Sequence, residues 1–219
     1  MKKVFAFVAV AVLFAGIANA QLGINVGYAP QTIKTTITSG STSTTGTMNL
    51  NGIFAGANYN INLTGDLGVS LGIDYRQNFG SDETTVAIPI VGSITSKNEY
   101  SQSLIDIPVL FNYGLNLTDD LKISVFLGPT FTIALAGNTH FTYTGNLVGF
   151  TGESEGDTDW YGDNSSRKKF DISGTAGLNV QFKSFRLFGG YNMGFLNLTD
   201  ADNTKVKSSN WFIGLGYSL

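Results

Sequence analysis

Eight segments of the chain alternate residue by residue between apolar and polar side chains, and this alternation limits the fold more than any other feature of the sequence. The segment "LGVSLGIDYR", residues 67–76, alternates Leu, Val, Leu, Ile and Tyr with Gly, Ser, Gly, Asp and Arg. A period of two is typical of an extended strand with one apolar and one polar face. The eight segments span residues 22–29, 53–63, 67–76, 105–117, 121–135, 170–182, 185–195 and 211–219.

The connections between these segments alternate in length. Strands joined alternately by short turns and long loops form an antiparallel up-and-down meander whose short turns all lie at one end. The short turns are predicted around 64–66, 118–120 and 183–184, and the long loops over 30–50, 78–102, 136–168 and 198–209.

The composition of the polar faces decides which face points inward. They consist mainly of Gly, Ser, Thr and Asn, which cannot fill a close-packed dry core, and they carry Asp74, Arg76, Asp106, Lys122, Asp171 and Arg186. Eight apolar faces in water would exceed the apolar patch that soluble monomers tolerate. The reverse arrangement places the apolar faces against lipid in a closed ring. We therefore predict an all-β fold: an eight-stranded antiparallel up-and-down transmembrane β-barrel.

Aromatic residues agree with a lipid-facing apolar surface. They lie on the apolar faces, often near strand ends, as an interfacial girdle requires. These residues are Tyr28, Tyr59, Tyr75, Tyr113, Tyr191, Trp211 and Tyr217.

The first 20 residues have the pattern of a secretory signal peptide, with Lys2 and Lys3, an apolar run and a small-x-small site at 18–20. We predict a signal peptide over 1–20, a barrel domain over 21–219, and export to the outer membrane. The absence of cysteine excludes disulfides, thiolate metal ligands and a lipoprotein anchor. The chain has 13 basic and 16 acidic residues. Loss of two lysines with the leader leaves a net charge of −5, which argues against a nucleic-acid partner.

Four segments carry a resemblance to a known family. "LIDIPVLFNYGL" (104–115) is similar to an L-x-I-P-L-L-x-x-Y strand, and "FLGPTFTIAL" (126–135) resembles the G-P strand that follows it. "FDISGTAGLNVQF" (170–182) and "GGYNMGFLNL" (189–198) match later strands in order. The chain thus resembles the eight-stranded outer-membrane β-barrel domain family of Gram-negative bacteria that includes the PorT-like proteins. The resemblance implies a fold and a location, but no single activity.

The last strand, "NWFIGLGYSL", resembles the signal read by the barrel-insertion machinery, although it ends in Leu instead of Phe. This resemblance implies the insertion machinery as a partner, in addition to outer-membrane lipid. The residues that would form the signal are Trp211, Ile213, Leu215, Tyr217 and Leu219.

The inward faces predict what fills the lumen. Asp74, Arg76, Asp106 and Asp171 are expected to form a polar ion-pair network that rigidifies the barrel. An eight-stranded barrel is about wide enough for side chains to fill its interior. This argues against a wide pore and leaves a narrow conductance open. The apolar residues expected inside are Phe54, Leu110, Phe126, Phe188 and Phe212.

The long loops contain the remaining candidates. His140 is the only histidine, and without a nucleophile at a telling spacing a solvated role is preferred over catalysis. The acidic stretch 151–163 either solvates the loop or holds Ca²⁺, and its Trp160 and Tyr161 would suit a sugar or a protein. We predict no catalytic residue, no cofactor and no metal site.

Two further loops have unusual composition. "TTVAIPIVGSIT" (84–95) is apolar for a solvent-facing loop. It is either a hairpin that extends the flanking strands and turns at 92–93, or an exposed edge for β-augmentation by a partner. "TSGSTSTTGT" (38–47) is predicted to be a low-complexity, mobile loop.

Together these features favour a non-enzymatic outer-membrane scaffold whose outward loops serve binding, adhesion or envelope structure, with a protein or glycan partner at the long loops. Two alternatives remain. A small lipid-modifying outer-membrane enzyme would depend on His140. A soluble exported lipocalin-like barrel that binds an apolar ligand would need an apolar interior.

Overall fold

The computed structural model describes residues 20–64, 66–90, 92–147, 150–163 and 165–219. The predicted signal peptide, apart from Ala20, lies outside the described residues. Among the described residues, no helix is both long and apolar enough to cross a membrane. The strands are β1 (Ala20–Tyr28), β2 (Gln31–Ser39), β3 (Thr42–Thr64), β4 (Leu67–Ile88), β5 (Gly92–Asn116), β6 (Leu121–Leu147), β7 (Phe150–Asp159), β8 (Phe170–Phe182), β9 (Phe185–Gly194) and β10 (Thr204–Ser218).

The strands close into an antiparallel ring. Neighbours along the sheet follow the order β3, β4, β5, β6, β8, β9 and β10, and β1 pairs with both β10 and β3. β2 pairs with the same two strands as β1, beyond a break at Pro30. Because proline has no N–H for a sheet ladder, the break divides one barrel strand into two. The ring therefore has eight positions, and the predicted eight-stranded barrel is confirmed.

The apolar faces of the strands lie on the outside of the ring. Val125 is 50% exposed and Leu215 is 61% exposed, while Arg76, Asp106 and Asp171 are buried. Among the described residues, most of the buried side chains are polar, and no dry apolar core fills the ring. The predicted orientation is confirmed, and the apolar interior that a lipocalin-like barrel requires is not present among the described residues.

Three of the predicted long loops are largely regular strand. The predictions of irregular loops over 30–50, 78–102 and 136–168 are wrong for most of their length, whereas the predicted hairpin at 84–95 is confirmed. β2 and β3 pair from Ser39–Thr42 onward, so 38–47 is a regular hairpin. β4 and β5 pair as far as Ile88 and Gly92, so 84–95 extends two barrel strands. The turn lies between these two residues, and its predicted position at 92–93 is wrong because Gly92 and Ser93 are paired in β5. β6 and β7 likewise form a hairpin within 136–168. These extensions are rich in Ser, Thr, Gly and Asn, and their few apolar residues, such as Val86, Ile94 and Tyr143, remain exposed.

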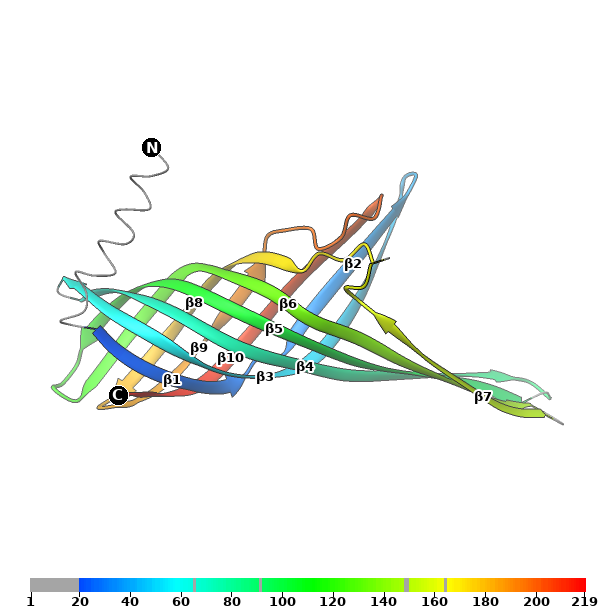
Figure 1. Cartoon of the computed structure of the whole chain (residues 1–219), viewed down its shortest axis with the longest axis horizontal. Coiled ribbons are helices and arrows are strands. Elements are labelled where there is room, and N and C mark those ends of the chain that lie inside the picture. The colour runs from blue at the N-terminus through cyan, green and yellow to red at the C-terminus, as the bar shows by residue number, and fades with distance from the viewer. Residues whose placement is uncertain (1–19, 65, 91, 148–149, 164) are drawn as a thin grey trace.

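Beyond the ring, the extended strands separate into two arms (Figure 1). One arm contains β2, residues 42–50 of β3 and residues 204–210 of β10. The other, here called the long arm, contains residues 80–88 of β4, 92–101 of β5, 138–147 of β6, and β7. The short turns lie at the opposite end of the barrel, near the C-terminus.

A closed ladder of this length predicts resistance to mild detergent denaturation. We expect the full chain to fold in detergent micelles and to migrate differently on gel electrophoresis with and without prior heating, because only heat opens the ring. Heat-independent migration together with full solubility in detergent-free buffer would contradict the barrel.

Candidate functional site

A buried ion pair joins the neighbouring strands β4 and β5 on the lumen side of the barrel. Arg76 Nε donates to Asp106 Oδ2 at 2.8 Å and Nη2 donates to Oδ1 at 3.2 Å. Thr132 Oγ1 donates to the same carboxylate at 2.6 Å. Bidentate geometry of this kind combines charge with fixed orientation. Two of the four predicted lumen residues therefore contact each other directly.

The other two predicted residues occupy different surroundings. Asp74 lies directly across from Asp106 in the ladder, and its Oδ1 has no hydrogen-bond partner among the described residues. Asp171 accepts hydrogen bonds from Ser208 Oγ at 3.0 Å and from the Ile172 N–H at 2.8 Å. Asp171 thus links β8 to β10 instead of joining an ion pair, so a single network of all four residues stays a prediction.

Four phenylalanine rings cross the lumen and form what we call the phenylalanine layer: Phe54, Phe126, Phe188 and Phe212. Neighbouring ring centroids are 6.1–6.3 Å apart, in the order Phe54, Phe188, Phe212 and Phe126. The first ring comes from β3 and the last from β6, so the chain of rings spans the bore. The predicted filling of the interior by these side chains agrees with this arrangement.

Glycines on neighbouring strands make room for these rings. A β-carbon on Gly27 would lie 2.4 Å from the Phe54 ring, and one on Gly177 would lie 2.3 Å from the Phe126 ring. Gly190 and Gly214 have the same relation to Phe212 and Phe188, at 2.8 Å and 2.6 Å. Each ring therefore needs a glycine beside it. Because each glycine lies on a different strand from the ring that it accommodates, this requirement is not visible when the strands are examined one at a time.

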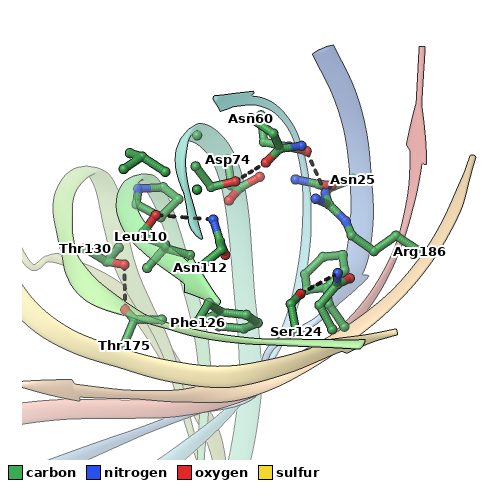
Figure 2. Close-up of a pocket in the computed structure, with 18 of the residues that line it drawn as sticks. Asn25, Asn60, Asp74, Leu110, Asn112, Ser124, Phe126, Thr130, Thr175 and Arg186 are labelled. Atoms are coloured by element: carbon green, nitrogen blue, oxygen red, sulfur yellow. Dashed lines mark hydrogen bonds between the residues drawn. The ribbon is translucent and has the colours of Figure 1, made fainter. Parts of the chain in front are cut away.

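A cavity of about 230 Å³ lies within the lumen. Its lining extends from Asp66 and Lys122, near the short turns, to Arg76 and Asp106, and it includes all four rings of the phenylalanine layer. Figure 2 shows Arg186 reaching toward Asn25 across this cavity, with Phe126 beside Ser124. Arg186 Nη2 also donates to Asn58 Oδ1 at 2.6 Å. Some buried polar atoms lining the cavity have no partner among the described residues, and a polar cavity of this size can hold water. These atoms are Asn58 Nδ2, Asp74 Oδ1, Asn179 Oδ1 and Arg186 Nε.

A second closure lies at the opposite, arm-bearing end of the barrel, and we call it the mouth cluster: Ile33, Leu50, Trp160 and Val206. Its side chains come from β2, β3, β10 and the segment that follows β7, which returns to the barrel near β2 (Figure 1). Trp160 is 6% exposed, and its Nε1 donates to Thr139 Oγ1 at 2.7 Å.

Polar and aromatic groups fix the mouth cluster in place. The guanidinium of Arg167 lies 4.3 Å from the centroid of the Trp160 ring. Gln102 Nε2 donates to Tyr161 Oη at 2.7 Å, and burial raises the pKa of Tyr161. Burial, and then the neighbouring Asp82, raises the pKa of Tyr100 to about 12. Both tyrosines therefore stay neutral at physiological pH, as a buried position requires.

Trp160 and Tyr161 are thus part of the barrel closure. Their predicted use as exposed residues that bind a sugar or a protein is wrong, because Trp160 is buried and Tyr161 is bonded to Gln102. The sequence does not reveal this, because it does not show that the segment after β7 folds back over the mouth.

Within the described part of the chain, the long arm has two strand edges without a neighbour. Pairing of β3 with β4 ends at Asn51 and Phe79, so residues 80–88 of β4 pair only with β5. β7 pairs only with β6. Unpaired edges present a row of free N–H and C=O groups that another strand can join. The two predicted interpretations of 84–95 are therefore compatible. The segment is an extended hairpin, and its β4 strand has an open edge.

The face of the long arm that continues the lipid-facing side of the barrel is acidic. In β7 it carries Glu153, Glu155 and Asp157, with Lys97 and His140 on neighbouring strands. His140 Nδ1 lies 3.0 Å from Asp157 Oδ1 on this exposed surface. Alternate residues of one strand are roughly 6.6 Å apart, so these carboxylates do not converge on one point. Among the described residues, no group of three or more acidic, His or Cys side chains is placed to hold a metal ion.

The sequence profile of one family matches most of the chain. The family is described as the outer membrane protein beta-barrel domain, and the match covers residues 14–200. The chain belongs to this family, and it is an integral β-barrel protein of the outer membrane of a Gram-negative envelope. A comparison with curated proteins gives no match.

Several solved structures are similar to the chain at low identity. Ail, the attachment invasion locus protein of Yersinia pestis, is 16% identical over 91% of this chain and 99% of that chain, with a TM-score of 0.39. Neisserial surface protein A is 12% identical over 90% and 97%, with a TM-score of 0.34. The N-terminal β-barrel domain of OprF from Pseudomonas aeruginosa is 13% identical over 92% and 100%, with a TM-score of 0.30. At these TM-scores the similarities do not bear on function.

The buried ion pair predicts an asymmetric cost of substitution. Arg76→Ala leaves the Asp106 carboxylate buried without its partner, and we expect a loss of about 3–5 kcal/mol in the free energy of unfolding, measured by urea titration in lipid vesicles. Lys97→Ala removes one partner of the exposed Lys97–Glu99 pair and serves as the matched control with a far smaller effect. Equal effects of the two substitutions would contradict a structural role for Arg76.

Proposed function

We propose that this outer-membrane barrel is a non-enzymatic binding scaffold whose long arm captures a partner along its open strand edges. The barrel anchors the arm in outer-membrane lipid. The phenylalanine layer and the mouth cluster keep the lumen closed, so the protein does not act as a diffusion pore. The partner is a protein segment outside the cell.

The observation that carries this proposal is the pair of open edges. Residues 80–88 of β4 and all of β7 have hydrogen-bonded neighbours on one side only. They lie on an extension of the barrel strands, remote from the short turns (Figure 1). β-Augmentation at such an edge obtains its affinity from main-chain hydrogen bonds and its specificity from alternate side chains.

Two finer assignments are part of the same proposal. The segments that resemble PorT-like proteins follow the chain order of the strands: three lie in β5, β6 and β8, and the fourth covers the end of β9 and the residues after it. This order supports a PorT-like member of the family. The five alternate residues Trp211 to Leu219 are all exposed on the outer side of β10 or at its end. This exposure supports their role as the signal for the barrel-insertion machinery.

The open edges predict where cross-links form in intact cells. A photo-reactive amino acid at Thr85, on the β4 edge, or at Thr151, on the β7 edge, is expected to give a discrete protein adduct. Thr144 is the matched control, because it is exposed on β6, which is paired on both sides. Electrophoresis and mass spectrometry identify the adducts. Adducts from Thr144 alone, or from none of the three positions, would argue against capture at the edges.

A lipid-modifying enzyme is the competing class, and it depends on His140. In the structure His140 pairs with Asp157 on an exposed sheet face and does not line the lumen cavity. We expect His140→Ala to leave the outer-membrane lipid profile of expressing cells unchanged by mass spectrometry, with wild-type protein and empty vector as references. A lipid species that appears with wild type and disappears with the variant would restore the enzyme hypothesis.

A further inference from the structure

We propose that the open edge of β7 selects an extended protein segment in which basic and large apolar residues alternate. This inference rests on the proposed function and names the partner chemistry for one of the two edges. It follows from the unpaired backbone of β7 and from the different side chains on its two faces.

The backbone of β7 is available over most of its length. Residues 150–159 pair with β6 in one uninterrupted register, from Phe150–Leu147 to Asp159–Asn138. No proline or bulge interrupts this strand, so nothing in it blocks addition of a further strand. An added strand in either direction places its residues alternately on the two faces of the sheet.

On one face, the added residues would meet carboxylates. Glu153, Glu155 and Asp157 are exposed and occupy successive positions on that face. Asp157 has His140 as a neighbour, whereas Glu153 and Glu155 form no ion pair within the described residues. Opposite charges directly across a strand pair are stabilising, and like charges are destabilising. Lysine or arginine at alternate positions of the partner therefore complements this face.

On the other face, the added residues would contact small residues of β7 that lie beside two aromatic rings of β6. Ser154 and Gly156 of β7 lie directly across from Tyr143 and Phe141 of β6. A β-carbon on Gly156 would lie 2.5 Å from the far end of the Phe141 ring, so this ring reaches over β7 toward the open edge. Tyr143 is 46% exposed. Large apolar side chains of the partner would pack against these rings, whose centroids are 5.6 Å apart.

A second copy of the chain does not suit the β7 edge. The other open edge that this protein offers, residues 80–88 of β4, carries Asp82 and Glu83 and no basic residue. Pairing of β7 with β4 of another molecule would bring carboxylates together. The charge of the edge therefore favours a basic partner over self-assembly.

Labelled synthetic octapeptides test this inference with the full-length protein in zwitterionic nanodiscs. The probe alternates Lys with Val or Phe. One control peptide has the same composition with all lysines grouped at one end, and a second control replaces each Lys by Thr. Fluorescence anisotropy measures affinity, and heat-dependent gel migration checks that each protein variant is folded.

We expect the alternating basic peptide to bind most tightly. Glu153→Gln with Glu155→Gln is expected to weaken its binding about tenfold at low salt. Asp82→Asn with Glu83→Gln, the matched change on the β4 edge, is expected to change it less than about twofold. Phe141→Ala is expected to weaken the basic and the Thr peptide alike, because it removes the apolar contact only.

Four results would overturn the inference. Equal binding of the grouped peptide would mean that charge attraction alone is responsible. Equal loss of affinity in the β4 variant would mean that β7 is not the site, as would the absence of binding by every peptide. Equal binding of the Thr peptide would remove the basic preference while leaving capture at the edges, and thus the proposed function, intact.

Discussion

Closure of the backbone hydrogen-bond ring is the constraint on which the rest of the structure depends. Lipid offers no partner for a free N–H or C=O, so the membrane-spanning strands must pair on both sides. β1 completes the ring by pairing with β3 and β10. A ring of eight strands encloses a bore that side chains nearly fill, and it is this narrow space that imposes glycines beside the phenylalanine rings. Beyond the lipid the same strands need no closure, and the ring divides into two arms.

The membrane-spanning half of the fold could be predicted from the sequence because lipid on one side and a polar bore on the other produce strict alternation. The arms could not be predicted in this way. Both faces of an arm contact water, so residues such as Thr36 and Thr45 give no periodic signal although they pair across β2 and β3. The alternation therefore predicted the strands of the ring, but not how far they continue beyond it.

The candidate site could be predicted from the sequence only where the charge of a residue on an inward face was sufficient evidence of its role. Charged residues on inward faces indicated the Arg76–Asp106 pair, whereas the role of Asp171 depends on Ser208, which is distant in sequence. Trp160 was misjudged because exposure was inferred from its polar neighbours, and its contacts with Ile33 and Val206 arise from chain reversal after β7. The open edges required the strand register, which a single sequence does not contain.

The continuity of β5 and β6 has a mechanical consequence. β6 runs for 27 residues from the short-turn end into the long arm, a length on the order of 90 Å. A tensile load applied along the arm would act parallel to the strands. Many inter-strand hydrogen bonds would then bear this load together, in shear, instead of opening one after another. Flow or traction on a tethered partner would be transmitted directly to the part of the molecule held by the bilayer.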